Sequence, residues 1–273
     1  MPEGHTIHRA ARDQNERFAG RVVRADSPQG RFVEGAALLD GRTLQKIEAY
    51  GKHLFYDFGD ELSVHVHLGL FGKYRLGKMP EPELKGLVRL RLRTETDWLE
   101  LRGPTACEIF SVEQRRLLLA RLGPDPLRAD SRPTKAYARI ASSRAPIGVL
   151  LMDQSVFAGI GNVYRAELLY RARIDPFATG NSVDPAALRN LWKDSRVVMA
   201  AGVEDRRMIT TRPRDRPHPT GAVRHDERYY VYHRTGKACR VCATPIRSGP
   251  MAARTVYWCP TCQGSKKKKR SSA

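Results

Sequence analysis

The stretch that decides the fold is "YGKHLFYDFGDELSVHVHLGLFGKYRLG", residues 50–77. Apolar and polar residues alternate along it, and glycines separate the alternating runs. Alternation with a period of two places apolar side chains on one face of a strand and polar side chains on the other. The pattern extends from Val22 to about Phe110, where "VRLRLR" and "WLELR" repeat it. This half of the chain is therefore predicted to form an antiparallel sandwich or barrel.

A helix is predicted at the start of the chain. Apolar residues recur there at helical spacing, and Gly20 is placed to end the last turn. These apolar residues are Ile7, Ala10, Ala11 and Phe18. We expect a helix over residues 5–19 that could pin the N-terminus against a core.

The second half of the chain has a helical period. Residues 121–135 contain three prolines and many charges, and they are predicted to be a linker. After it, "PIGVLLMDQSVFA" and "VYRAELLYRARI" predict two amphipathic helices separated by "GIGN". Asp184 and Pro185 supply the N-cap and first position of a third helix. Residues 204–228 show no clear period, and we expect a mobile loop there.

The charge of the chain points to a polyanionic partner. Its 273 residues include 48 Lys and Arg against 29 Asp and Glu, which gives a formal net charge of +19 and a pI of about 10.1. No apolar run approaches the roughly 20 residues of a membrane-spanning helix, and no cleavable signal is expected at the start. Nucleic acid is therefore favoured over a lipid surface.

Four of the five cysteines form two pairs near the C-terminus. Cys239-x2-Cys242 is followed after sixteen residues by Cys259-x2-Cys262, which is the spacing of a four-cysteine zinc ribbon; four unrelated thiols are the alternative. Four thiolates complete a tetrahedral site, so the predicted zinc is structural and catalysis must come from elsewhere. Paired cysteines of this kind indicate a reducing compartment, and we expect a cytoplasmic protein. Cys107 is predicted to be a small buried apolar residue.

The extreme N-terminus offers a possible nucleophile. Most chain termini are frayed and have no such role. If Met1 is removed, however, Pro2 carries a free α-amine, and α-amines have a pKa of about 8, far below that of a lysine side chain, so that part of them is neutral at pH 7. Such an amine can form a Schiff base with a sugar aldehyde, and Glu3 beside it can move protons.

Three further positions suit contacts with phosphate. "GIGNVYR", residues 159–165, places two glycines and an asparagine at a helix start, either as a phosphate cradle or only as a tight turn. Lys52 lies at a strand start, where it is either a phosphate contact or a solvated lysine. Arg254 lies in a short hairpin predicted between the cysteine pairs and could project toward a phosphate.

One loop carries apolar residues at its tip. "VHLGLFGKYR", residues 66–75, ends a predicted strand and presents Leu70 and Phe71 between glycines. Such residues are often tucked into a core. The alternative is a wedge that enters the base stack and fills the gap left by an extruded nucleotide.

Taken together, these motifs resemble the bacterial formamidopyrimidine-DNA glycosylase and endonuclease VIII family. Its members begin with Pro-Glu, carry a "GK" lysine, a helix–two-turn–helix with "GxGN" and a C-terminal zinc finger. The resemblance spans almost the whole chain, excluding residues 204–228 and the lysine tail. The opening "PEG" and the later "PTACEIF" resemble the endonuclease VIII branch, and the "DPRRFG" loop of the other branch is absent. Leu70 falls where this branch carries its intercalating loop.

The resemblance implies roles for particular residues. Pro2 would be the Schiff-base nucleophile, and Glu3 would be the acid/base group that helps to open the deoxyribose. The positions that match the family's phosphate contacts are Lys52, Asn162 and Arg254. One departure is Thr6, which replaces a second N-terminal glutamate near the lesion pocket.

The function implied by the resemblance is a bifunctional DNA glycosylase and abasic-site lyase that removes oxidised bases, expected to be pyrimidines. Its partner would be damaged DNA, its metal one structural zinc ion, and the chain would act as a monomer. A non-catalytic zinc-ribbon protein that binds nucleic acid is the alternative, although such a protein has no need of Pro2 and Glu3.

The expected fold class is a multidomain α+β protein with an N-terminal antiparallel β-sandwich, a helical DNA-binding domain and a zinc-finger hairpin. The predicted boundaries are 1–120 for the sandwich, 121–135 for the linker, 136–228 for the helical domain, 229–264 for the zinc finger and 265–273 for a basic tail.

Overall fold

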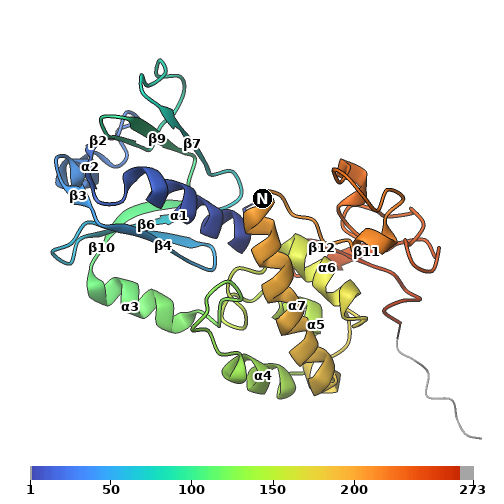
Figure 1. Cartoon of the computed structure of the whole chain (residues 1–273). Coiled ribbons are helices and arrows are strands. Elements are labelled where there is room, and N and C mark those ends of the chain that lie inside the picture. Colours follow the sequence, from blue (N-terminus) through green and yellow to red (C-terminus); the bar gives the residue numbers. More distant parts are fainter. Residues whose placement is uncertain (1, 265–273) are drawn as a thin grey trace, which may run out of the picture. The chain divides into compact units, whose positions relative to one another are not determined.

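The structure, a computed structural model, describes residues 2–264, and the chain divides into two compact units, Met1–Leu122 and Gly123–Ala273 (Figure 1). The predicted basic tail, residues 265–273, lies outside the described residues. The division falls at the start of the predicted linker; the finer domain boundaries stay predictions.

The first unit is built from two four-stranded antiparallel sheets, which confirms the predicted sandwich. One sheet has the order β10-β6-β5-β4 and the other the order β2-β8-β9-β7, while β1 pairs with β3. The elements are α1 (Gly4–Phe18), β1 (Arg21–Val22), β2 (Arg24–Asp26), α2 (Val33–Leu39), β3 (Thr43–Leu44), β4 (Lys46–Tyr50), β5 (His53–Asp57), β6 (Ser63–His67), β7 (Lys73–Lys78), β8 (Leu90–Arg93), β9 (Asp97–Arg102), β10 (Ala106–Phe110) and α3 (Val112–Arg121).

The alternation in the sequence decides which strand residues enter the core. On β5, Leu54 and Tyr56 belong to the buried apolar cluster, whereas His53 and Phe55 lie on the opposite face. Tyr56 pairs in register with Val64 of β6, so both strands present apolar residues to the same side.

Helix α1 also packs on this core. Ile7 and Phe18 are fully buried, and Gly20 ends the region with a φ of 76° that favours glycine. The predicted helix over residues 5–19 is confirmed to within one residue at each end. Cys107 is buried in the same core as predicted, and burial raises its pKa to about 12. Helix α2 was not predicted, because its seven residues follow a region of period two and are too few to show a helical repeat.

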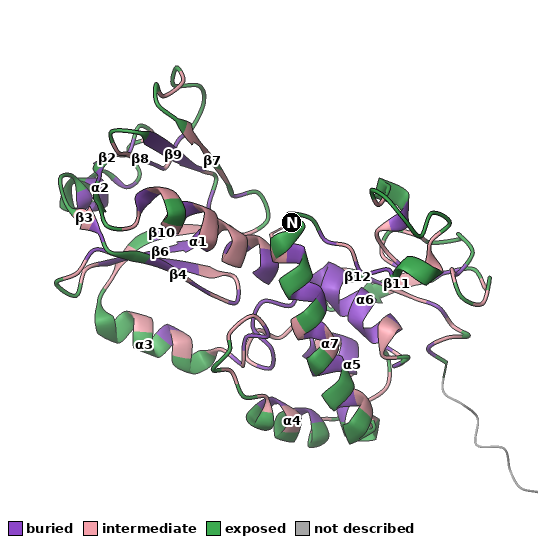
Figure 2. Cartoon of the chain, viewed as in Figure 1, coloured by how far each residue is buried: buried purple, intermediate pink, exposed green. Residues whose placement is uncertain are grey.

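The second unit is mainly helical and ends in a two-stranded ribbon. Its elements are α4 (Thr134–Ala141), α5 (Ile147–Leu150), α6 (Asn162–Arg171), the 3₁₀ turns Gly180–Ser182, Pro213–Asp215 and His225–Glu227, α7 (Pro185–Glu204), β11 (Arg247–Met251) and β12 (Arg254–Trp258). Figure 2 shows that α6 is buried along nearly its whole length. Asp184 caps α7 by accepting from the N–H of Ala186 at 3.0 Å, as the sequence predicted.

The prediction of one long helix over "PIGVLLMDQSVFA" was wrong. Helix α5 ends at Leu150, and a series of turns follows. Asp153 Oδ1 accepts hydrogen bonds from the backbone N–H of Ser155 at 2.9 Å and from its hydroxyl at 2.5 Å. These local bonds compete with helical ones, which is why the helix does not continue.

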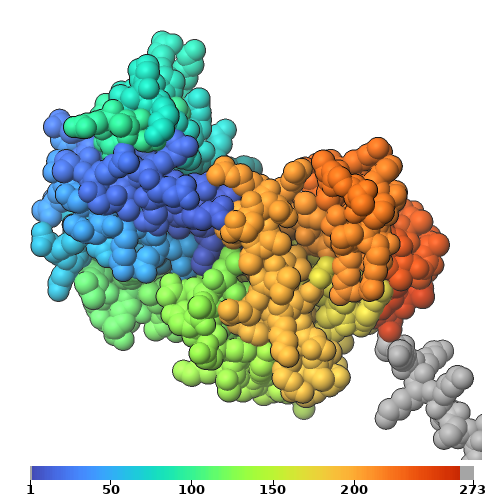
Figure 3. Space-filling model, viewed as in Figure 1, coloured from blue at the N-terminus to red at the C-terminus, as the bar shows by residue number. Residues whose placement is uncertain are grey.

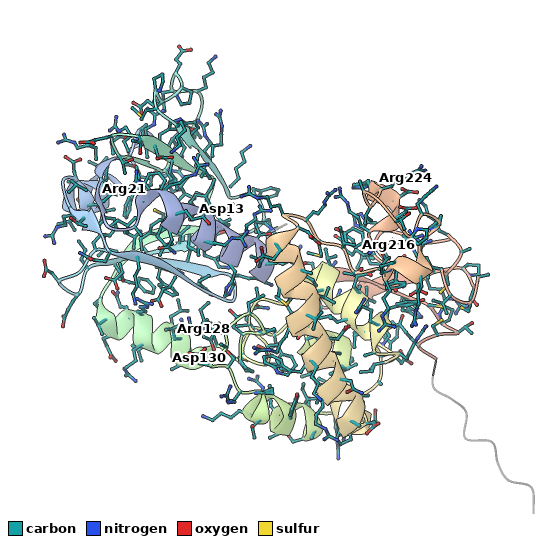
Figure 4. The ribbon with its side chains drawn as sticks, viewed as in Figure 1. Asp13, Arg21, Arg128, Asp130, Arg216 and Arg224 are labelled. Carbon is teal, nitrogen blue, oxygen red and sulfur yellow. The ribbon has the colours of Figure 1, made fainter. Side chains whose placement is uncertain are left out.

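Residues 204–228, expected to be a mobile loop, are hydrogen-bonded to α6 through Thr210, and the residues just after the segment are bonded to the same helix. The buried carboxylate of Glu167 on α6 accepts bonds from the N–H groups of Tyr230 and Val231 at 2.8 Å, and from the hydroxyl of Thr210. Arg216 and Arg224 lie on this segment (Figure 4). The carboxylate therefore holds Thr210 within the segment, and Tyr230 and Val231 just after it, on one helix.

In the part of the chain that the structure describes, no helix combines the length and the apolar character needed to cross a membrane.

Candidate active site

Glu3 lies at the position where α1 begins. Its carbonyl oxygen accepts a hydrogen bond from the N–H of Thr6 at 2.8 Å, which starts the helix, and the residue is completely buried. A carboxylate near a helix N-terminus is stabilised by the exposed N–H groups and the helix dipole. The fold therefore keeps an acidic group beside Pro2.

A pocket of about 420 Å³ opens along α1 within the first unit. Pro2 and Leu70, which the sequence predicted as parts of one site, both line it. Thr6 lines it as well, so the residue that departs from the family pattern faces the same space. The space-filling view shows that α1, in blue, reaches the surface of this unit (Figure 3).

The loop at the end of β6 presents its apolar tip to solvent. Leu70 is 42% exposed and Phe71 is 86% exposed, so the alternative that these residues lie in the core is wrong. Glycines make the turn possible. The φ of Gly69 is 65°, and a Cβ on this residue would come within 1.9 Å of the Thr105 hydroxyl. A Cβ on Gly72 would come within 2.3 Å of a backbone carbonyl oxygen. Exposed apolar residues on a tight turn fit insertion into the base stack better than they fit a place in the core.

Lys52 lies at the turn before β5 and next to a group of histidines. His65 Nδ1 is 3.1 Å from Glu108 Oε1, and His65 Nε2 is 2.8 Å from His53 Nδ1. Burial, with the nearby His65, lowers the pKa of His53 to about 3, and burial also lowers the pKa of His67. The imidazoles are therefore neutral at pH 7, and they add no positive charge next to Lys52.

In the second unit, Asn162 and Arg254 lie close together. The side-chain amide of Asn162 donates to the carbonyl oxygen of Thr255 at 3.1 Å, and Thr255 follows Arg254 on β12. The completely buried Arg165 donates to the same carbonyl at 3.1 Å and to Asn162 Oδ1. The first turn of α6 is thus fastened to the strand that carries Arg254.

The four paired cysteines converge as the spacing predicted. Their sulfur atoms all lie within 4.8 Å of one another, and the Cys242 to Cys259 separation is 3.4 Å. Four sulfurs bound at 2.3 Å to a tetrahedral zinc would be about 3.8 Å apart, so the arrangement fits such an ion. These distances are much too long for disulfides, and all five cysteines of the chain are free.

Two residues of the second unit escaped the analysis of the sequence. Arg165 and Glu167 lie in a helix whose charged residues would ordinarily face solvent, yet both are completely buried. The helix was predicted to be amphipathic, and its periodicity carried no signal that these two charges face the core.

Comparison with known proteins decides the family. Residues 1–117 match the formamidopyrimidine-DNA glycosylase N-terminal domain, and residues 122–213 match the formamidopyrimidine-DNA glycosylase H2TH domain. The chain belongs to the formamidopyrimidine-DNA glycosylase and endonuclease VIII family. Members of this family are DNA glycosylases with abasic-site lyase activity, and the chain is such an enzyme of base excision repair.

Individual relatives within the formamidopyrimidine-DNA glycosylase and endonuclease VIII family agree with this assignment. Endonuclease 8 1 of Mycobacterium bovis is 46% identical over 96% of this chain and 100% of its own length. Formamidopyrimidine-DNA glycosylase of Thermus thermophilus is 32% identical over 89% of this chain and 90% of its own. A solved structure of Lactococcus lactis Fpg with abasic-site DNA has the same fold, with a TM-score of 0.80 and 23% identity, over 96% of this chain and 99% of that one.

The assignment excludes the alternative of a non-catalytic zinc-ribbon protein. The match covers the N-terminal unit that carries Pro2 and Glu3, and the relatives match beyond the cysteine module alone. The family match does not test the roles of individual residues, which are proposals.

Proposed function

We propose that this glycosylase uses the amine of Pro2, freed by removal of Met1, as its nucleophile on oxidised pyrimidines in DNA. The observation that carries the proposal is that Pro2 and Leu70 line one pocket, with the buried Glu3 next in the chain. The first unit would thereby supply the nucleophile, a group for proton transfer and a wedge that enters the base stack.

The chemistry follows from the secondary amine. The Pro2 nitrogen attacks C1′ of the damaged nucleotide, the bond from C1′ to the base breaks, and the base leaves with the proton that the nitrogen loses. Glu3 protonates the ring oxygen as the deoxyribose opens, and the nitrogen and C1′ form an iminium ion. The iminium draws electrons from the sugar, so loss of a proton from C2′ expels the 3′ phosphate, and water then releases the enzyme.

We assign the phosphate contacts to Lys52, Asn162 and Arg254. The formal charge of +19 favours binding to the DNA backbone through release of counterions. Asn162 also bonds to the carbonyl of Thr255, so its side chain would help to orient the strand that carries Arg254. Leu70 and Phe71 would fill the space left by the extruded nucleotide.

We assign one zinc ion to Cys239, Cys242, Cys259 and Cys262. The all-sulfur donor set leaves no position for water, and bound zinc would supply folding energy to the ribbon rather than chemistry. We expect the enzyme to act on damaged DNA as a monomer, and its expected cytoplasmic location stays a prediction.

Borohydride trapping tests the nucleophile. The protein is mixed with DNA that contains an abasic site, reduced with borohydride, digested and analysed by mass spectrometry. We expect the cross-link on Pro2, and we expect a chain that retains Met1 to form none. Glu3→Gln should suppress base excision more strongly than cleavage at a site that is already abasic. A cross-link on Lys52 with Pro2 unmodified would refute the proposal.

A further inference from the structure

The end of α6 packs against the cysteine cluster. Helix α6 lies beside β12 (Figure 1), and its residue Tyr170 shares a small buried core with Cys239 and Cys259. Just after the helix, the carbonyl oxygen of Ile174 accepts a hydrogen bond from the side chain of Gln263 at 2.9 Å. The cysteines therefore lie against a helix as well as within their own ribbon.

Each of the four sulfur atoms has a polar partner besides the other sulfurs, and the ribbon itself supplies two of these partners. The hydroxyl of Thr244 lies 3.4 Å from Cys242 Sγ. The backbone N–H of Cys262 donates to Cys259 Sγ at 3.4 Å. Both partners belong to the same short turns as the cysteines they contact.

The other two partners come from α6 and the turn that follows it. The hydroxyl of the fully buried Tyr170 lies 3.1 Å from Cys239 Sγ. The guanidinium of Arg173 lies over the Tyr170 ring, 4.9 Å from its centroid, and it attracts and hydrogen-bonds to Cys262. A thiolate bound to a metal has no proton, so the tyrosine hydroxyl would be the donor, as a guanidinium always is.

Arg173 has a backbone conformation that favours glycine. Its φ is 58°, and it directly follows Ala172, the C-cap residue of α6. Glycine adopts this left-handed conformation at a helix end without the steric cost that a side chain brings. The contacts of the guanidinium with Tyr170 and Cys262 offset that cost, which gives a reason for a long cationic side chain at this position.

The charge of a loaded site explains why such donors are needed. Four thiolates carry twice the charge of one Zn²⁺ ion, so the bound cluster is dianionic. Cys239 and Cys259 are buried, and buried charge is costly unless it is hydrogen-bonded. Donors to metal-bound groups also fix their orientation and strengthen metal binding. Arg173 is exposed to solvent, so its attraction is screened more than the bond from the buried hydroxyl.

We propose that Tyr170 and Arg173 belong to the metal site, where they donate to the Cys239 and Cys262 thiolates and help to retain the zinc ion. The inference rests on the zinc assignment within the proposed function, and it is independent of the role of Pro2. The ribbon then supplies the four ligands and two of the donors, and the end of α6 supplies the other two.

The proposal gives α6 a second role in positioning the ribbon. At its start, Asn162 bonds to the carbonyl of Thr255 beside Arg254, and at its end Tyr170 meets Cys239. The ribbon is thus attached to both ends of one helix. Loss of the metal would weaken the attachment at the cysteines, and with it the support of the strand that carries Arg254.

The rate of zinc release tests the proposal. The purified full chain is mixed with excess chelator at pH 7, and the released zinc is measured over time. Tyr170→Phe keeps the buried ring and removes only the hydroxyl, and we expect it to release zinc about tenfold faster than the wild type. Arg173→Gly should also release zinc faster. Glycine suits a φ of 58° better than arginine does, so backbone strain cannot cause this increase.

A spectrum of the cobalt-substituted protein reports on the sulfurs themselves. Co²⁺ is bound in place of zinc, and the near-ultraviolet charge-transfer band from thiolate to metal is recorded. A hydrogen bond lowers the energy of the sulfur electrons that move to the metal. Loss of the hydroxyl in Tyr170→Phe should therefore shift the band to longer wavelength. A change in the stability of the fold alone leaves the position of this band unchanged.

Two variants are matched controls. Tyr230→Phe removes a hydroxyl from the ring that stacks on Tyr170 at 4.6 Å, but this hydroxyl bonds to Asp215 rather than to a sulfur. Arg206→Gly makes the same exchange as Arg173→Gly, at a φ of 56° just beyond the end of α7. Both controls should release zinc at the wild-type rate and leave the cobalt band in place.

Different results would overturn the inference and the zinc assignment. Wild-type rates of zinc release in Tyr170→Phe and Arg173→Gly, with an unshifted cobalt band, would overturn the inference and leave the zinc assignment intact. A native protein that contains no zinc would refute the assignment, and the inference with it.

Discussion

Asn162 and Thr255 are joined by a hydrogen bond of 3.1 Å from the side-chain amide to the backbone carbonyl, across 93 positions of sequence. The buried guanidinium of Arg165 donates to the same carbonyl and to Asn162 Oδ1. The three groups join the first turn of α6 to β12, next to Arg254. Two proposed phosphate contacts therefore share one rigid support.

Replacing Arg165 should destabilise the second unit. Arg165→Met keeps much of the side-chain volume but leaves Asn162 Oδ1 without its donor, and it removes the bond of 3.4 Å to the Gly148 carbonyl. We expect the free energy of unfolding to fall by about 3 kcal/mol, measured by urea denaturation. Exposed Arg144→Met is the control and should change it by less than about 0.5 kcal/mol. Equal effects of the two variants would contradict the structural role.

Removing one thiolate should release the metal. Because a zinc ion bound by the four cysteines would hold the ribbon together, Cys259→Ser is expected to lose zinc and to weaken DNA binding. Elemental analysis of the purified protein should find one zinc per chain in the wild type and much less in the variant. Cys107→Ala, in the other unit, should retain the full content. A native protein without zinc would rule out this assignment.

The proposed wedge, Leu70 and Phe71, can be tested with little risk to the fold. Leu70→Ala and Phe71→Ala remove apolar groups that already face solvent, so each should change stability by less than about 0.5 kcal/mol. Excision from duplex DNA should slow by about tenfold, while cleavage at a preformed abasic site, where extrusion costs less, should slow less. Leu87→Ala, at another exposed leucine of the same unit, should leave both rates unchanged. Equal losses on both substrates would argue against a wedge.

Stability should decrease in mild acid because of the buried histidines. Burial lowers the pKa of His53 to about 3 and that of His5 to about 4, whereas both titrate near 6.5 when unfolded. Between these values only the unfolded chain binds the protons, so stability is complete above pH 6.5 and falls as the pH drops toward 3. Each histidine should contribute a loss of about 1 kcal/mol by pH 5.5.

Denaturation curves of the wild type and His53→Gln at pH 7.5 and 5.5 measure this effect. The variant should lose less stability between the two pH values than the wild type, whatever its stability at pH 7.5. His8→Gln is the control, because it also removes a histidine from the first unit, but one that is only partly buried. A wild-type stability that is constant between these pH values would contradict the prediction.

Several elements could be predicted because their causes are local. The alternation in residues 50–77 places every second side chain on one face of a strand, and two such faces must pack together to be buried. The cap at Asp184 and the spacing of the paired cysteines likewise depend on neighbours within a few residues. The roles proposed for Pro2, Glu3, Lys52 and Arg254 follow from short motifs in the sequence.

Other elements could not be predicted because the hydrogen bonds of a side chain, whether to near or to distant residues, override the apolar period. The helix at 147–150 is cut short by Asp153, and the segment at 204–228 is ordered by Glu167, a carboxylate more than 35 residues earlier in the chain. Periodicity reports only which face of an element is apolar, and it carries no information about the partner of a buried charge.

The sequence by itself determined the class of strands and helices, the four cysteines that could hold a metal ion and the strongly basic character of the chain, because each depends on composition or on spacing along the chain. Only the tertiary structure decided that Leu70 and Phe71 face solvent, that Arg165 holds Asn162 against β12, and that one face of α1 lines a pocket with Pro2. The physical reason is that burial and hydrogen bonding are settled between segments that are far apart in the chain, where the cost of an unpaired buried group outweighs the preference of any single residue.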